Sequence, residues 1–336
     1  MSGLINYRGF NLNDTPSLQG KVCVITGGQS GIGKEMTAQL LLHDISKVYV
    51  LARSKEKFDE AVKYCQETHK LAHEDIVQRV AFMHCDLSDI TDVKRVADVL
   101  RGNLDRLDVL IGNAGVPTVA DYTLSPQGIE TIWAANVVGH FTLLNILLPI
   151  IEKTAEKHGD ARIALTASSL HSNCEELNLD LTMSPTPTKN PHSLDSFWRY
   201  CRSKLGVILL TRELARRLDK KGANNVYVNT FFPGNIPTEA MDTWKDLIGP
   251  AGAAVKGIFQ FIGQSLGDAA ASAIYLAASP EVTKKNQKGK YFIPIATECE
   301  PSKLAQDPDL ARNLWYWCDD KVTQALGKGW EGSESM

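Results

Sequence analysis

The feature that most constrains the fold is a regular alternation, between residues 21 and 295, of short apolar runs with segments of helical periodicity. The runs are rich in β-branched residues, as is typical of strands that are covered on both faces. Between the first two runs, Ile32, Met36 and Leu40 mark one apolar helix stripe. The alternation predicts an α/β fold, a Rossmann-type doubly wound parallel sheet with helices on both faces. The predicted strands are 22–25, 48–51, 80–83, 109–111, 163–165, 226–228 and 291–293.

The chain has 336 residues and no shift in composition along its length, so we expect a single Rossmann-type domain over 1–336. Two stretches interrupt the alternation. Residues 175–195 are predicted to form a long loop. Residues 237–266 are apolar with interspersed glycines and follow a predicted strand closely. A lid over the substrate and a helix packed on its own domain explain this second stretch equally well. From 301 to 336 we expect a helical extension that ends in a polar tail.

The charge balance of 36 Lys and Arg against 39 Asp and Glu gives no basic excess, so no nucleic-acid partner is expected. No uninterrupted run of 18 apolar residues occurs, and we expect no transmembrane segment. The seven cysteines form no C-x-x-C pair, which is typical of a reducing compartment, and we expect a cytoplasmic protein. His69 and His73 have the spacing of a helical metal site, but their charged neighbours indicate an exposed helix, and no metal is expected.

A glycine-rich loop follows the first predicted strand and opens a helix, with the sequence T-G-G-Q-S-G-I-G over residues 26–33. Glycine permits a tight turn and close approach of a pyrophosphate, and the helix N-terminus favours its negative charge. An ordinary strand-to-helix turn is the alternative. The residues expected to contact the dinucleotide here are Gly27, Gln29, Ser30, Gly31, Ile32 and Gly33.

The second strand ends at Ala52-Arg53, where an acidic residue would hold the ribose 2′-hydroxyl of NAD. Arg53 can instead bind a 2′-phosphate through charge-assisted hydrogen bonds worth roughly 1.5–3 kcal/mol. The sequence therefore predicts NADP(H) in preference to NAD(H). A solvated surface arginine is the alternative.

Two further strand ends carry candidate cofactor contacts. Asp86 and Leu87 follow the third strand, where Asp86 can accept a hydrogen bond from an adenine amine or cap the helix that begins near Ser88. The fourth strand ends in a run of small residues that permits close approach of a ligand. The candidates in that run are Asn113, Ala114 and Gly115.

An acid–base pair lies on a predicted helix, where Tyr200 and Lys204 share a face at i and i+4 spacing. A free tyrosine has a pKa near 10, and a nearby ammonium favours its phenolate. Such a tyrosine can protonate a reduced carbonyl oxygen or deprotonate an alcohol. The fifth strand ends at Ser168, whose hydroxyl can donate to the substrate oxygen, with Ser169 as a rival.

Taken together, these motifs resemble the short-chain dehydrogenase/reductase family, and within it the retinol-dehydrogenase-like branch, over about residues 18–314. The resemblance adds Asn136 as the family's catalytic asparagine and matches the P-G-x-x-x-T motif to Pro233, Gly234 and Thr238. The chain departs from the family where Gly112 replaces the first asparagine of N-N-A-G.

The resemblance implies a role for each matched residue. Tyr200 would be the general acid/base, and Lys204 would lower its pKa and hold the nicotinamide ribose. Ser168 would orient the carbonyl, and Asn136 would hold a water in a proton relay to Lys204. Ile236 would offer its backbone to the nicotinamide carboxamide.

The implied function is an NADP(H)-dependent oxidoreductase that transfers a hydride between nicotinamide and a lipophilic ketone, aldehyde or alcohol. The expected partner is that small lipophilic molecule, and a homodimer is compatible with the sequence. Two alternatives are an NADP(H)-binding regulatory or interaction protein without turnover, and an isomerase or dehydratase that uses the cofactor transiently. The combination of Asn136, Ser168, Tyr200 and Lys204 argues against the first. The spacing of the glycine loop and the absence of a visible second domain argue against the second.

Overall fold

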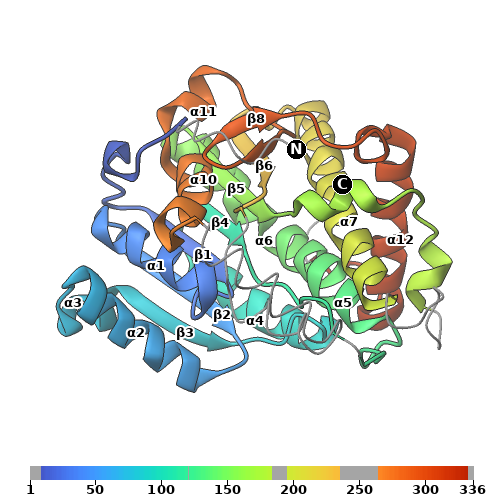
Figure 1. Ribbon diagram of the computed structural model, residues 1–336, viewed down its shortest axis with the longest axis horizontal. Coiled ribbons are helices and arrows are strands. Elements are labelled where there is room, and N and C mark those ends of the chain that lie inside the picture. Colours follow the sequence, from blue (N-terminus) through green and yellow to red (C-terminus); the bar gives the residue numbers. More distant parts are fainter. Residues whose placement is uncertain (1–8, 120, 184–194, 235–263, 332–336) are drawn as a thin grey trace.

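The computed structural model describes residues 9–119, 121–183, 195–234 and 264–331, and it contains one eight-stranded sheet (Figure 1). The strand order is β3-β2-β1-β4-β5-β6-β7-β8, and all pairs are parallel except β7 with β8. The predicted α/β Rossmann-type fold is thus confirmed. The strands are β1 Val22–Thr26, β2 Lys47–Ala52, β3 Val80–His84, β4 Val109–Gly112, β5 Ala161–Thr166, β6 Val226–Phe231, β7 Tyr291–Ile293 and β8 Thr297–Cys299.

The antiparallel edge strand β8 is the one strand that the sequence did not predict. It is three residues long, and its T-E-C sequence has no apolar run. It pairs with β7 through a tight connection, with Tyr291 opposite Cys299. A strand of three residues is too short to show a periodic signal in the sequence.

Helices cover both faces of the sheet (Figure 1). One face carries α1 with α10, and α2, α3 and α11 complete this layer. The opposite face carries α4, α6 and α7, and α12 packs on the outer side of α7 and also contacts α4. The helices are α1 Gly31–Leu42, α2 Lys55–His69, α3 His73–Arg79, α4 Ile90–Asn103, α5 Thr131–Trp133, α6 Gly139–His158, α7 Asp195–Lys221, α10 Leu266–Ala278, α11 Pro280–Lys284 and α12 Pro308–Leu326.

Several shorter helical turns connect these elements. The most important for the site is η2, a π-helical turn that joins α5 to α6 without a break. The turns are η1 Leu12–Asp14, η2 Ala134–Val138, η3 Ser169–Asn173, η4 Leu179–Met183 and η7 Leu304–Gln306. Turn η4 lies within the predicted long loop 175–195, whose residues 184–194 are outside the described part of the chain.

The buried apolar side chains form two clusters, one on each side of the sheet. Val24 and Leu110 belong to the cluster beneath α4 and α6, whereas Ile25 and Ile111 belong to the cluster beneath α1 and α10. Successive residues of a strand point to opposite faces, so a strand that is covered twice needs apolar residues at every position. This requirement is the physical reason for the continuous apolar runs in the sequence.

Helix α6, together with α5 and η2, is long and apolar enough by composition to cross a membrane, over Thr131–His158. The sequence-based expectation of no such segment counted only uninterrupted apolar runs and missed it. In the fold, 94% of its apolar window is buried against the sheet and its neighbouring helices. Its apolar character is that of a central core helix.

The order of the strands creates a crevice at the carboxyl ends of β1 and β4. The chain moves outward from β1 to β2 and β3, and then returns to the other side of β1 to form β4. The loops that leave β1 and β4 therefore diverge onto opposite faces, through α1 on one side and toward α5 on the other. Ligands of open α/β sheets bind in the crevice at such a switch point.

The expected C-terminal helical extension is present as η7 and α12. Asp307 caps α12, because its side chain accepts hydrogen bonds from the N–H groups of Asp309 and Leu310 at 2.9 and 3.0 Å. The expectation for the segment 237–266 concerns residues that lie, up to residue 263, outside the described part of the chain.

Candidate functional site

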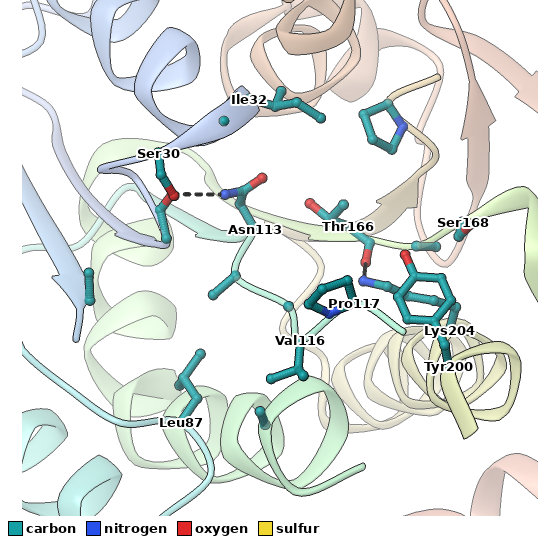
Figure 2. Close-up of a pocket in the computed structure, with 18 of the residues that line it drawn as sticks. Ser30, Ile32, Leu87, Asn113, Val116, Pro117, Thr166, Ser168, Tyr200 and Lys204 are labelled. Atoms are coloured by element: carbon teal, nitrogen blue, oxygen red, sulfur yellow. Dashed lines mark hydrogen bonds between the residues drawn. The ribbon is translucent and has the colours of Figure 1, made fainter. Parts of the chain in front are cut away.

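A cavity of about 900 Å³ lies at the carboxyl ends of the central strands, and its lining includes both Arg53 and Tyr200. Figure 2 shows the part of this lining around Asn113, Tyr200 and Lys204. Most of the residues predicted from the sequence line it. They are Gly27, Gln29, Ser30, Gly31, Ile32, Arg53, Asp86, Leu87, Asn113, Ala114, Gly115, Ser168, Tyr200, Lys204, Pro233 and Gly234. Gly33 and Asn136 do not line the cavity but support its wall. Ile236 and Thr238 lie outside the described residues.

The glycine loop is built for a negatively charged group. Gly27 has a φ of 67°, in the left-handed region that favours glycine, and a side chain at Gly33 would overlap the Gly27 carbonyl oxygen. Asn113 fixes the loop by donating to the carbonyl oxygens of Thr26 and Gly27 at 3.3 and 3.1 Å. Figure 2 shows the Asn113 side chain turned toward this loop.

The first turn of α1 points its N–H groups into the cavity without a side-chain cap. Ser30 occupies the N-cap position, and its side chain makes no capping hydrogen bond. The first N–H groups of a helix have no partner within the helix and favour an anion. The residues present therefore fit the pyrophosphate of a dinucleotide.

The end of the cavity near β2 is cationic. Arg53, at the end of the strand, is exposed and lines the cavity, and Lys57 lines it one turn into α2. Ser54 caps α2 by accepting from the Lys57 N–H at 3.2 Å. The sequence analysis predicted Arg53 but not Lys57, although Lys57 lies only four residues later and carries the same charge.

Asp86 is the only acidic side chain that lines the cavity among the described residues. Its Oδ1 accepts hydrogen bonds from the N–H and the hydroxyl of Ser88, at 2.9 and 2.7 Å. The cap of α4 is Asp89, which accepts from the Thr91 N–H at 2.9 Å. The structure therefore favours the cavity position over the capping role for Asp86.

Tyr200 and Ser168 meet at the opposite end of the cavity, although 31 residues separate them in the sequence. Tyr200 comes from α7 and Ser168 from the end of β5, and their side chains share a hydrogen bond. Ser168 is buried and also accepts from the Leu170 N–H at 3.2 Å. Ser169 is exposed, so the geometry favours Ser168 over its rival.

Lys204 lies beside this pair and is buried, with 3% of its surface exposed. Its Nζ donates to the Thr166 carbonyl oxygen at 2.8 Å, as Figure 2 shows, and lies 5.6 Å from the centre of the Tyr200 ring. Burial lowers the pKa of Lys204 to about 8. The side chain is therefore still mostly charged at neutral pH.

The pKa of Tyr200 shifts opposite to the direction expected from Lys204. Burial raises the pKa of Tyr200 to about 12, and the hydrogen bond from Ser168 offsets only part of this. Removing a phenol from water penalises its charged form, and here that effect outweighs any attraction from the ammonium. The net shift of the Tyr200 pKa is therefore upward, and Tyr200 is a neutral phenol in this state of the protein.

Asn136 lies in the π-helical turn η2, behind the cavity wall. Its Oδ1 accepts from the Val116 N–H at 2.7 Å, and its Nδ2 donates to the Val116 carbonyl at 3.1 Å and to Ser203 Oγ at 3.0 Å. The Ser203 hydroxyl in turn donates to the Tyr200 carbonyl at 2.8 Å. The Asn136 side chain thus ties the loop after β4 to the helix that carries Tyr200 and Lys204.

Sequence reasoning missed the apolar wall of the cavity. Val116, Pro117, Leu170 and Phe232 line the cavity, and all lie in connections that follow strands, Leu170 in turn η3. Loop residues have no periodicity, so no sequence signal placed them. His171, three residues after Ser168, is buried against Tyr291, and its Nδ1 hydrogen-bonds to the Ser168 carbonyl oxygen.

A Rossmann-type sheet with a glycine loop at its switch point, and a Ser, Tyr and Lys beside the same cavity, defines a dinucleotide-dependent oxidoreductase. The sequence model of the family described as short chain dehydrogenase matches residues 21–174. A short-chain dehydrogenase/reductase of Armillaria gallica is 33% identical over 310 residues, which cover 92% of this chain and 93% of that protein. The chain therefore belongs to the short-chain dehydrogenase/reductase family.

Two further comparisons refine this result. Retinol dehydrogenase 13 of Mus musculus is 29% identical over 94% of this chain and 88% of that protein, and the chain falls in the retinol-dehydrogenase-like branch. The solved structure of the Pseudomonas aeruginosa RhlG/NADP active-site complex has the same fold, with a TM-score of 0.60 and 22% identity. The structural match covers 86% of this chain and 98% of the RhlG chain.

Proposed function

We propose that this protein is an NADP(H)-dependent reductase of lipophilic ketones or aldehydes, which also catalyses the reverse oxidation of the alcohols. The observation that carries the proposal is the meeting of Tyr200 and Ser168 at one end of the cavity, with the buried ammonium of Lys204 beside them. A carbonyl group placed against both hydroxyls would be held and protonated at its oxygen.

The chemistry divides between the cofactor and the chain. The bound nicotinamide supplies the hydride for the carbonyl carbon or accepts it in the reverse direction. The Ser168 hydroxyl donates to the carbonyl oxygen and stabilises the negative charge that develops there. The Tyr200 phenol then transfers its proton to that oxygen, and the Lys204 ammonium stabilises the phenolate that remains. A neutral phenol, which the raised Tyr200 pKa provides, suits reduction.

Two cations support the preference for NADP(H). Arg53 and Lys57 both line the end of the cavity where the adenosine ribose would lie, and no acidic residue comes directly after β2. A 2′-phosphate would gain charge-assisted hydrogen bonds there. The RhlG complex, a fold relative, contains NADP.

The apolar wall formed by Val116, Pro117, Leu170 and Phe232 supports a lipophilic substrate. Binding such a substrate removes apolar surface from water on both partners, at about 25 cal/mol per Å². A relative named retinol dehydrogenase acts on a molecule of this kind.

The proposal is tested by following NADPH absorbance with a panel of apolar ketones and aldehydes, for the wild type and for Tyr200→Phe. Loss of the phenol proton should reduce kcat by at least about 100-fold, the typical contribution of general acid catalysis. NADPH binding should persist, because the ring and Lys204 remain. Tight binding of NADPH without turnover of any carbonyl would instead favour the regulatory alternative. An equal rate for the variant would refute the role of Tyr200.

A cytoplasmic location is also part of the proposal. All seven cysteines are free thiols, and six of them are buried, which suits a reducing compartment. A fluorescent fusion expressed in cells should show a diffuse cytosolic signal, and accumulation in an organelle would contradict it.

A further inference from the structure

His140 has no role in the proposed reaction, yet it hydrogen-bonds to two residues that hold the cavity wall in place, Thr26 and Asn136. It is on the first turn of α6, directly after the π-helical turn, and it is 4% exposed. Its ring bonds to two elements that build the cavity. Nε2 lies 3.0 Å from Thr26 Oγ1, at the end of β1, and Nδ1 lies 3.2 Å from the Asn136 carbonyl oxygen.

These contacts define one tautomer. A carbonyl oxygen can only accept, so Nδ1 must carry the proton and donate to Asn136. In a neutral ring Nε2 then accepts, and the Thr26 hydroxyl donates to it. The Thr26 oxygen keeps a lone pair for the Ala114 N–H, which donates to it at 3.0 Å. Every polar atom of the three groups is satisfied in this arrangement.

The neutral state of the ring has an independent cause. Burial and the positive charge of Lys204 on α7 lower the pKa of His140 to about 4, although the carbonyl groups of Asn136 and Ala135 act in the opposite direction. An imidazolium would also leave the Thr26 hydroxyl proton without its present acceptor.

The ring is matched to the glycine that departs from the family motif. A Cβ at Gly112 would lie 2.9 Å from Cδ2 of His140 and would overlap the side chain of Leu165. Gly112 and His140 are therefore complementary in this structure, because the glycine leaves room for the ring.

We propose that His140 is a positioning residue. It connects turn η2, which contains Asn136, to Thr26 and Ala114, the two residues that we call the nucleotide wall of the cavity. One side of the ring fixes Thr26 and through it Ala114, which lines the cavity. The other side holds the main chain of Asn136, whose side chain ties Val116 to the helix of Tyr200 and Lys204. The inference rests on the proposed function in its catalytic part, whereas its structural part concerns cofactor binding alone.

Three substitutions test the two hydrogen bonds of His140 separately. His140→Leu removes both and roughly keeps the volume. His140→Asn keeps a donor near the Nδ1 position, and His140→Gln keeps an acceptor near the Nε2 position. The matched control is His158→Leu, because His158 lies at the exposed end of the same helix.

The first measurement is the Kd for NADPH by fluorescence titration, followed by kcat and the two KM values. Leaving buried polar groups without partners should raise the Kd of His140→Leu by about ten-fold. We expect kcat to fall as well and the KM for the carbonyl substrate to stay unchanged. His140→Gln should recover cofactor binding better than His140→Asn, and His158→Leu should match the wild type. Wild-type affinity in His140→Leu would overturn the proposal.

Two measurements keep the proposal testable if His140→Leu does not fold. In the wild type labelled with ¹⁵N-histidine, the NMR spectrum at neutral pH should show two buried rings protonated at Nδ1, because His171 Nδ1 also donates to a carbonyl oxygen, that of Ser168. The signal of His140 is assigned by its loss in His140→Gln. A ring protonated at Nε2 would refute the geometry. Thr26→Val, which keeps the side-chain shape, should weaken NADPH binding alone but add little to His140→Gln or His140→Leu. Additive effects would show that the two residues act separately.

These outcomes are distinct from a failure of the proposed function. If the wild type turns over no carbonyl substrate, the tautomer and the NADPH affinities still decide whether His140 positions the nucleotide wall. If turnover is normal but the His140 variants bind NADPH as the wild type does, the positioning role alone fails.

Discussion

Arg53 shows what a single residue decides in this site. The carboxyl end of β2 is occupied by Ala52 and Arg53, and this was readable from the sequence because strand ends in such sheets face the cofactor. The structure adds that Arg53 is exposed and lines the cavity, where the proposed 2′-phosphate would lie. The proposed cofactor preference therefore depends on the residues at one strand end.

Arg53→Ala should raise the KM for NADPH by about 10- to 150-fold, which corresponds to the loss of roughly 1.5–3 kcal/mol of charge-assisted hydrogen bonding. The KM for NADH should change little, because NADH has no 2′-phosphate. Steady-state kinetics with both cofactors measures the effect, and Lys63→Ala, an exposed cation on α2, is the control. Equal changes for NADPH and NADH would contradict a phosphate-binding role.

Lys204 illustrates a functional residue that costs stability. Its pKa is about 8 in the folded protein, against about 10.4 in an unfolded chain. Between these values the unfolded chain binds more protons, so stability from this group rises with pH. The cost of burying the ammonium is fully present below pH 8 and is relieved as the pH approaches 10.

Lys204→Met should therefore be more stable than the wild type at pH 7, by up to about 3 kcal/mol before the lost bond to Thr166 is subtracted. The difference should shrink at pH 9.5, and turnover should be lost at both. Urea unfolding at the two pH values provides the measurement. A variant that is less stable at pH 7, or a difference that does not depend on pH, would show that burial of the charge is not costly.

Elements were predictable where their burial pattern is periodic or continuous. All seven parallel strands lie within a few residues of the predicted runs, because each is covered on both faces. Strand β8 and the π-helical turn η2 were not predicted. The first is too short to show a pattern, and the second differs from α-helix by its hydrogen bonding and not by its composition.

Helix α12 is an element whose role becomes clear only through its packing. Trp315 is buried on the outer side of α7, with its ring 4.9 Å from that of Phe141 and the guanidinium of Arg217 at 4.5 Å. Its neighbour Tyr316 points outward and is 56% exposed. The helix thus completes the core on this face of the sheet.

Trp315→Ala should reduce the free energy of unfolding by about 3–5 kcal/mol, because it leaves a cavity between α12, α6 and α7. Tyr316→Ala is the matched control and should cost less than about 1 kcal/mol. Urea denaturation followed by circular dichroism measures both. Equal effects of the two substitutions would show that α12 does not contribute to the core.

At the scale of the whole molecule, the two-sided burial of the sheet explains both the fold and an ambiguity in the sequence. The helix at 131–158 has the composition of a membrane span because it is enclosed by the sheet and by α4, α7 and α12. The expectations of one domain over 1–336 and of a homodimer stay predictions.

The sequence by itself determined the α/β class, the strands, the glycine loop and the chemical identity of the acid–base set. The strands and the glycine loop are local patterns of residues close together along the chain, whereas the acid–base set combines motifs that lie far apart in it. Tertiary structure alone decided the partners: Ser168 rather than Ser169 beside Tyr200, the bonds that occupy Asn136, and the pairing of His140 with Gly112. It also reversed the expected direction of the Tyr200 pKa shift, because desolvation depends on everything packed around a group and not on its neighbours in sequence.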